Sequence, residues 1–74
     1  MKEYNVLVFR QRLREAMRSA GINYVQMGDL LDQDPKNLRE IAYRAPKQGP
    51  TAQTLMELSQ VLGCSIDYLL GVES

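Results

Sequence analysis

The four residues 32–35 (Asp-Gln-Asp-Pro) most restrict how this chain folds, because they have the features of a tight turn between two short helices. The preceding residues 23–31 have the composition and spacing of a helix of about two turns. Asp34 followed by Pro35 is typical of a helix start, where the aspartate caps the first turn and proline's missing N–H costs nothing. The pattern therefore predicts a second, mostly polar helix over residues 35–44.

Polar caps and glycines mark the boundaries of five helices along the chain. A side chain that can accept hydrogen bonds from the first turn precedes each helix, and glycine follows three of them. Residues 6–9 leave an alternative open, because they also suit a short strand, but no second strand pattern exists to pair with it. The expected caps, in chain order, are Asn5, Asn23, Asp34, Thr51 and Ser65.

Apolar side chains at three- and four-residue steps predict one core shared by these helices. We expect methionines at helical spacing to fill that core rather than to form a cofactor site. Cys64 is either a small buried hydrophobe or a reactive thiol, and its apolar neighbours favour the first. The expected core residues are Phe9, Leu13, Ala16, Met17, Ala20, Met27, Leu55, Met56, Leu58, Val61 and Leu62.

Length and composition favour a single small all-α domain over residues 1–74. The apolar fraction of 45% is enough for a globular core. No apolar run approaches the ~20 residues that span a bilayer, so we expect no membrane association and a cytoplasmic protein. The chain has no histidine and one cysteine, and no glycine-rich phosphate loop. We therefore expect no enzyme activity, no metal site and no cofactor.

Charge is sorted along the chain, although the formal net charge is zero. Residues 1–18 and 36–47 each carry a net charge of +3, and residues 19–35 and 48–74 each carry −3. Part of the positive charge thus falls on the second helix of the pair and the loop after it. Such a basic face can bind phosphate even on a neutral protein.

The order of five helices and the apolar positions around the turn resemble phage repressor and Cro-type, or lambda-repressor-like, helix-turn-helix domains. The closing phrase 62–71 (Leu-Gly-Cys-Ser-Ile-Asp-Tyr-Leu-Leu-Gly) adds to the resemblance, which covers roughly residues 9–71. It implies a compact five-helix DNA-binding fold with the helix-turn-helix over about residues 24–43. The family's small residue in the first helix of the motif matches Gly28, and its turn residue, often a left-handed glycine, matches Asp32. The resemblance also implies a buried position for each of Met27, Leu31, Leu38 and Ile41.

Three departures from the family pattern affect its site. Tyr24 replaces the glutamine that often binds a phosphate, and its hydroxyl suits either a phosphate or surface packing. Met17 and Ala42 stand where the family often has an Arg–Glu pair, and an apolar replacement of such a pair is often neutral or stabilising. Pro35 occupies a position where related repressors often place a base-reading side chain, so base reading must shift to its neighbours.

The register of the motif predicts which side chains contact DNA. Glu40 has an alternative explanation, because Arg44 four residues later is a possible helix ion-pair partner. Four arginines of the first helix (10, 12, 14 and 18) are expected to form a solvated face rather than to touch DNA. The base-contacting candidates are Lys36, Asn37, Arg39 and Glu40, and the phosphate-contacting candidates are Asn23, Tyr24, Tyr43, Arg44, Lys47 and Gln48.

These expectations support a sequence-specific transcriptional regulator whose partner is an operator in double-stranded DNA. A weak homodimer would place two copies on half-sites ~34 Å apart. Its candidate interface residues are Tyr68, Leu70 and Val72, with the exposed part of residues 6–8 as a second choice. The alternative is a protein-interaction module on the same scaffold, such as an antirepressor or an antitoxin-like partner, with weak or no DNA binding. Fold alone does not decide between the two.

Overall fold

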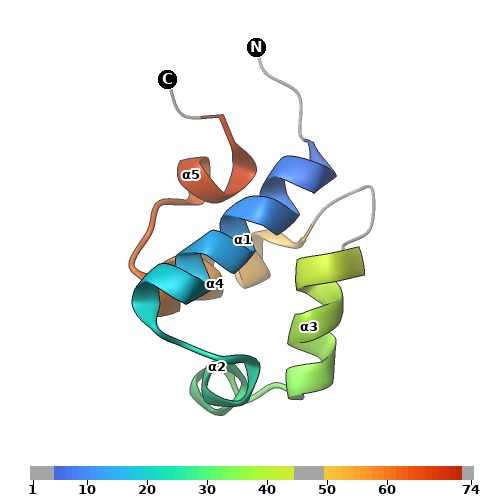
Figure 1. The fold of residues 1–74 in the computed structure, drawn as a ribbon, viewed down its shortest axis with the longest axis vertical. Coiled ribbons are helices and arrows are strands. Elements are labelled where there is room, and N and C mark those ends of the chain that lie inside the picture. The colour runs from blue at the N-terminus through green and yellow to red at the C-terminus, as the bar shows by residue number, and fades with distance from the viewer. Residues whose placement is uncertain (1–4, 45–49, 73–74) are drawn as a thin grey trace.

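The computed structural model describes residues 5–44 and 50–72, and in these ranges the chain forms five helices and no strand. The helices pack into one all-α globule (Figure 1). Their bounds are Val6–Ala20 for α1, Tyr24–Leu31 for α2, Pro35–Arg44 for α3, Ala52–Leu62 for α4 and Ile66–Leu70 for α5. Residues 6–9 lie within α1, so the helix interpretation of this segment is confirmed and the strand alternative is wrong.

Side-chain caps begin the helices where the sequence predicts them. The Asn5 side chain accepts hydrogen bonds from the backbone N–H groups of residues 7 and 8. Asn23 and Gln26 form a reciprocal capping box, in which each side chain bonds the other residue's backbone N–H. The Thr51 and Ser65 side chains cap α4 and α5 by accepting hydrogen bonds from the backbone N–H groups of Thr54 and Tyr68. These bonds satisfy N–H groups that have no partner within the helix.

The turn between α2 and α3 has the conformation predicted for it. Asp32 lies in the left-handed region at φ 54° and ψ 47°, which aspartate tolerates better than most residues. Asp34 Oδ1 accepts a hydrogen bond from the backbone N–H of Lys36 at 2.9 Å, directly after Pro35 begins α3. Gly28 lies where the two helices meet, because a Cβ there would be 2.6 Å from the carbonyl oxygen of Gln33.

The buried core draws on all five helices, and the part of the chain that the structure describes buries no polar residue in it. Two expected core residues are outside it: Met56 is 48% exposed, and Ala20 is exposed at the last position of α1. Ala20 is the last residue of α1, directly before the left-handed Gly21 that ends the helix. The buried residues are Phe9, Leu13, Ala16, Met17, Met27, Leu38, Ala42, Leu58, Leu62 and Leu69. Leu31, Ile41, Leu55, Val61 and Cys64 are half-buried and pack against them.

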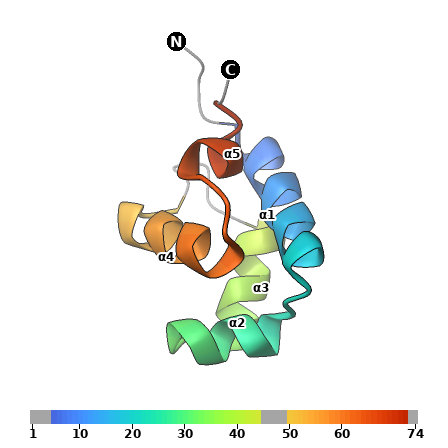
Figure 2. The same ribbon diagram turned by 90° about the vertical axis from the view of Figure 1, so that its left-hand side faces the viewer.

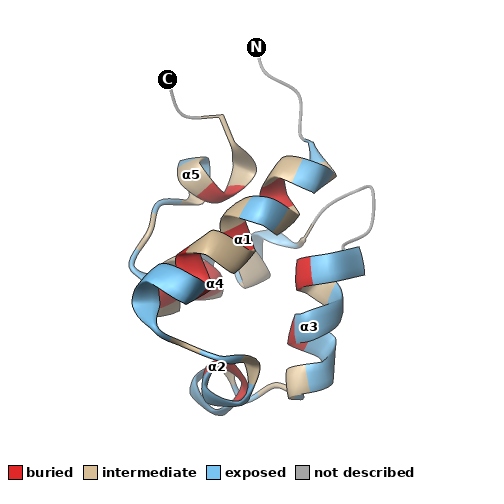
Figure 3. Cartoon of the chain, viewed as in Figure 1, coloured by how far each residue is buried: buried red, intermediate tan, exposed pale blue. Residues whose placement is uncertain are grey.

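Helix α1 is central to the arrangement, because it packs against α3, α4 and α5. Helix α3 packs against α1 and α2 alone among the described helices, and it stands at the side of the globule away from α5 (Figures 1 and 2). Its inner side carries the buried Leu38 and Ala42, and the rest of its surface is largely exposed (Figure 3). This packing holds α3 from behind and leaves its outer side open.

Candidate nucleic-acid interface

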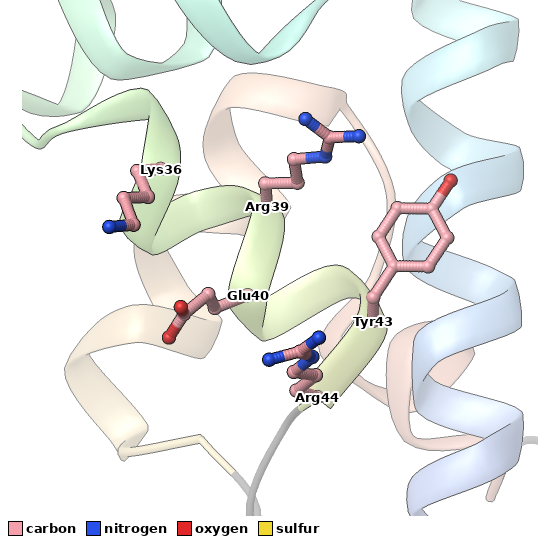
Figure 4. Close-up of a pocket in the computed structure, with 5 residues that line it drawn as sticks. All are labelled: Lys36, Arg39, Glu40, Tyr43 and Arg44. Carbon is pink, nitrogen blue, oxygen red and sulfur yellow. The ribbon is translucent and has the colours of Figure 1, made fainter.

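The outer side of α3 carries most of the predicted DNA contacts. Five exposed side chains line an open hollow there, and they comprise three cations, one acid and one tyrosine: Lys36, Arg39, Arg44, Glu40 and Tyr43. They share one surface because they recur at three- and four-residue steps along a helix. Lys36 and Glu40 point to one side of α3, and Tyr43 points to the other, toward α1 (Figure 4). The arrangement suits binding of a polyanion with some discrimination among donors and acceptors.

Glu40 is free to face a ligand. In the described chain no ion pair joins its carboxylate to Arg44, and the two side-chain ends lie apart in Figure 4. The helix ion pair that offered another explanation for Glu40 is therefore absent. A carboxylate among cations can accept a hydrogen bond from a base amino group such as cytosine N4.

Tyr24 at the start of α2 lies near Tyr43 in the last turn of α3. Burial raises the pKa of the Tyr24 hydroxyl above its ordinary value, and the neighbouring Tyr43 raises it further. The positive charges of Arg14 and Arg39 act in the opposite direction. Two predicted phosphate contacts are thus brought near each other, with two arginines close to them.

Arg14 belongs to this cluster, and the prediction that it lies on a solvated face is wrong. Its Nη1 donates a 2.9 Å hydrogen bond to the carbonyl oxygen of Ala42, and its Cζ lies 4.9 Å from the centre of the Tyr43 ring. The Ala42 carbonyl is among the last four of α3, which have no partner within the helix. The sequence held a signal for this contact. Arg14 lies one turn before Met17 and Tyr43 directly follows Ala42, and the resemblance aligned Met17 and Ala42 with an Arg–Glu pair.

Arg12 is also engaged within the molecule rather than solvated. Its Nη1 donates to the carbonyl oxygen of Tyr68 at 3.1 Å, and its Cζ lies 4.5 Å from the centre of the Tyr68 ring. The Tyr68 hydroxyl donates to Glu15 Oε2 at 3.4 Å. Of the four arginines in α1, Arg18 alone is fully exposed.

Met17 and Ala42 link α1 and α3 through core packing. Met17 is 6% exposed and Ala42 is fully buried, and both belong to the core. These are the two positions that the resemblance aligned with an Arg–Glu pair. Arg14 supplies a polar link between the same two helices one turn earlier on α1.

Of the remaining predicted DNA contacts, two lie within the described residues and two lie outside them. Asn37 is exposed on α3 but does not line the hollow. Asn23 is exposed at the start of α2, and its Oδ1 is occupied by the capping bond to the Gln26 N–H, which leaves its amide donors for a ligand. Lys47 and Gln48 lie outside the described residues.

The two candidate dimer surfaces lie next to each other. A Cβ at Gly71 would meet Val8 Cγ1, so the end of α5 adjoins the start of α1. Leu7 is 66% exposed there, whereas Tyr68, Leu70 and Val72 are half-buried. Residues 6–8 and 68–72 therefore form one continuous surface, on which Leu7 is the most exposed large apolar side chain.

Within residues 5–44 and 50–72, no group of three or more acidic, cysteine or histidine side chains is placed to hold a metal ion. No helix in those ranges has both the length and the apolar character needed to cross a membrane.

Comparison with known proteins adds no further identification. No protein-family model matches the chain, and neither the curated proteins nor the solved structures contain a match.

Proposed function

We propose that this protein is a sequence-specific DNA-binding transcriptional regulator of the lambda-repressor-like class, with residues 24–43 as its helix-turn-helix. The observation that carries the proposal is the outer side of α3, where five exposed side chains, three of them cationic, line one hollow. A polar helix that projects from a globule and packs only from behind fits the major groove. Lys36, Arg39 and Glu40 are the proposed base contacts within the hollow, with Asn37 beside it.

The cluster at the edge of α3 supports contact with the DNA backbone. Tyr24 at the start of α2 and Tyr43 in the last turn of α3 present hydroxyls, and Arg44 presents a charge at the end of α3. Phosphate contacts of this kind fix the register of a protein on DNA, whereas base contacts select the sequence. Lys47 and Gln48 follow α3 in the chain and remain proposed phosphate contacts.

A homodimer formed through residues 6–8 and 68–72 would complete the proposed regulator. Exposed apolar surface at Leu7 supports this location. Two copies of α3 would then bind half-sites about one helical turn, ~34 Å, apart on an operator. A regulator of this kind acts in the cytoplasm.

A salt titration of DNA binding tests the proposal. Fluorescence anisotropy with a mixed-sequence duplex measures Kd at several salt concentrations. We expect the logarithm of affinity to fall linearly with the logarithm of salt, with a slope near −3 for about three phosphate contacts. Selection of tight-binding duplexes from a random library then identifies the operator. Absence of binding at low salt overturns the proposal.

Such a result would favour the second candidate, a protein-interaction module of the antirepressor or antitoxin-like kind. Its supporting observation is the outer side of α2, where Val25 is 60% and Leu30 is 65% exposed. Asp29 and Asp32 are exposed near them. An apolar and acidic surface suits a protein better than a DNA backbone.

A further inference from the structure

Arg12 and Arg14 make the same pair of contacts with different helices. Each guanidinium donates to a carbonyl oxygen near the end of a helix, at 3.1 Å to Tyr68 and 2.9 Å to Ala42. Each also lies over a tyrosine ring, Tyr68 for Arg12 and Tyr43 for Arg14. The two arginines therefore use one geometry to hold α5 and α3 against α1.

The two tyrosines differ in what their hydroxyls do. The Tyr68 hydroxyl donates its proton to Glu15, so that proton is used within the molecule. Tyr43 is 53% exposed, so its hydroxyl is open to a ligand. A tyrosine hydroxyl can donate one hydrogen bond to such a ligand. Tyr43 therefore keeps a donor that Tyr68 has already used.

We propose that Arg14 is a positioning residue for DNA binding, which holds the Tyr43 ring so that the Tyr43 hydroxyl donates a hydrogen bond to a backbone phosphate. This inference rests on the proposed function and adds to it a residue outside α2 and α3. Arg14 is half-buried, and its guanidinium already donates to the Ala42 carbonyl oxygen. It acts through the ring beneath it, because a planar guanidinium stacks on an aromatic face and restricts its rotation.

A double-mutant cycle tests this role. Affinities are measured for Arg14→Met, Tyr43→Phe and the double variant on a mixed-sequence hairpin duplex of about 12 base pairs, just over one helical turn. Mixed sequence suffices because a phosphate contact does not depend on the base. We expect each single variant to bind roughly tenfold more weakly, the loss of one hydrogen bond to a charged group. The double variant should lose no more than either single variant, because both remove the same contact.

The salt dependence separates positioning from direct contact. If Arg14 itself neutralised a phosphate, Arg14→Met would reduce the salt slope by about 0.9. A positioning role leaves the slope unchanged while the affinity falls. Arg14→Lys still reaches the Ala42 carbonyl but has no plane to lie over the ring, so we expect an intermediate loss with the same slope.

Arg12→Met is the matched control, because it removes the same two kinds of contact at α5. We expect it to lower the melting temperature as Arg14→Met does, and to leave affinity for the short duplex within about twofold. Circular dichroism confirms that each variant is folded at the assay temperature, and Arg14→Lys replaces Arg14→Met if the latter is unfolded.

The outcomes distinguish the two proposals. Additive losses for Arg14→Met and Tyr43→Phe, a reduced salt slope, or equal losses for Arg12→Met and Arg14→Met overturn the role of Arg14 and leave DNA binding intact. Absence of binding by the unaltered protein overturns both. Coupled losses at a constant slope, confined to Arg14, support the positioning role.

Discussion

Gly28 on α2 approaches the backbone of Gln33 so closely that a Cβ at position 28 would lie 2.6 Å from the Gln33 carbonyl oxygen. The same Cβ would lie 3.3 Å from two ring carbons of Pro35. The Gly28 carbonyl in turn accepts a 2.9 Å hydrogen bond from the backbone N–H of Gln33. The spacing between α2 and the start of α3 is thus fixed by backbone contacts, which have little freedom to adjust.

Gly28→Ala should therefore destabilise the protein. In an unobstructed helix the change would gain about 1 kcal/mol from helix propensity. Here the added methyl group meets backbone, and overpacking of this kind costs about 1–3 kcal/mol. Urea unfolding monitored by circular dichroism measures the difference. Val25→Ala, at an exposed position of the same helix, is the control and should change stability by less than about 0.5 kcal/mol. A Gly28→Ala variant as stable as the parent would refute the close approach.

Asp32→Gly should stabilise the turn. Asp32 is the one described non-glycine residue with positive φ, and glycine adopts φ 54° without the steric conflict of a Cβ. We expect a gain of up to about 1 kcal/mol, reduced by the greater freedom of glycine in the unfolded chain. Asp32→Val, which adds a β-branched side chain, should lower stability by a similar amount. Thermal melts of the three proteins give the order, and a valine variant equal to the glycine variant would contradict it.

Arg39→Ala should weaken operator binding by about 1–3 kcal/mol if Arg39 reads a base, and it should reduce discrimination at one position. Equal loss on operator and mixed-sequence duplexes would instead identify a phosphate contact. Arg18→Ala removes an exposed arginine of α1 and serves as the charge-matched control. Comparison of both variants on both duplexes separates the specific effect from the loss of one positive charge.

Stability should fall in alkaline solution. Burial raises the pKa of the Cys64 thiol above 9.0, and burial followed by the Glu15 charge raises that of Tyr68 above 10.0. The folded chain therefore keeps these protons at a pH where the unfolded chain has lost them, which favours unfolding. The stabilisation is complete below about pH 9 and is lost as pH rises through the folded-state values. Urea unfolding from about pH 8 to 11 measures the decline.

Cys64→Ala tests the first part of this decline. Because it removes the thiol, its stability should stay level to about pH 10 and fall only when the tyrosines titrate. The comparison uses the shape of each pH profile, since loss of the side chain also changes packing at every pH. A profile that rises above pH 9 would contradict the raised pKa values.

Local features of the fold could be predicted from the sequence because their causes are local. Each cap bonds an N–H two or three residues away. The left-handed conformation of Asp32 and the need for a small residue at Gly28 followed from the resemblance. The close approach of Gly28 to Gln33 gives the physical reason for the second.

Long-range partners could not be predicted in this way. The bonds from Arg12 and Arg14 span 56 and 28 residues of sequence, and no periodicity along α1 distinguishes these arginines from the exposed Arg18. Helical spacing also assigned Met56 to the core, although α4 turns that side chain outward. Periodicity gives the direction of a side chain relative to its own helix, and the packing of other helices decides what covers it.

The packing of α3 against α1 also limits how far the chain can be shortened without loss of the α3 fold. Its inner side depends on α1 for the Arg14 bond to the Ala42 carbonyl and for apolar cover over Leu38. A synthetic peptide of residues 24–44 would lack both, and a segment of that length without tertiary support is marginally helical in water. The smallest unit worth transplanting into another protein is accordingly the entire bundle, with its first helix intact.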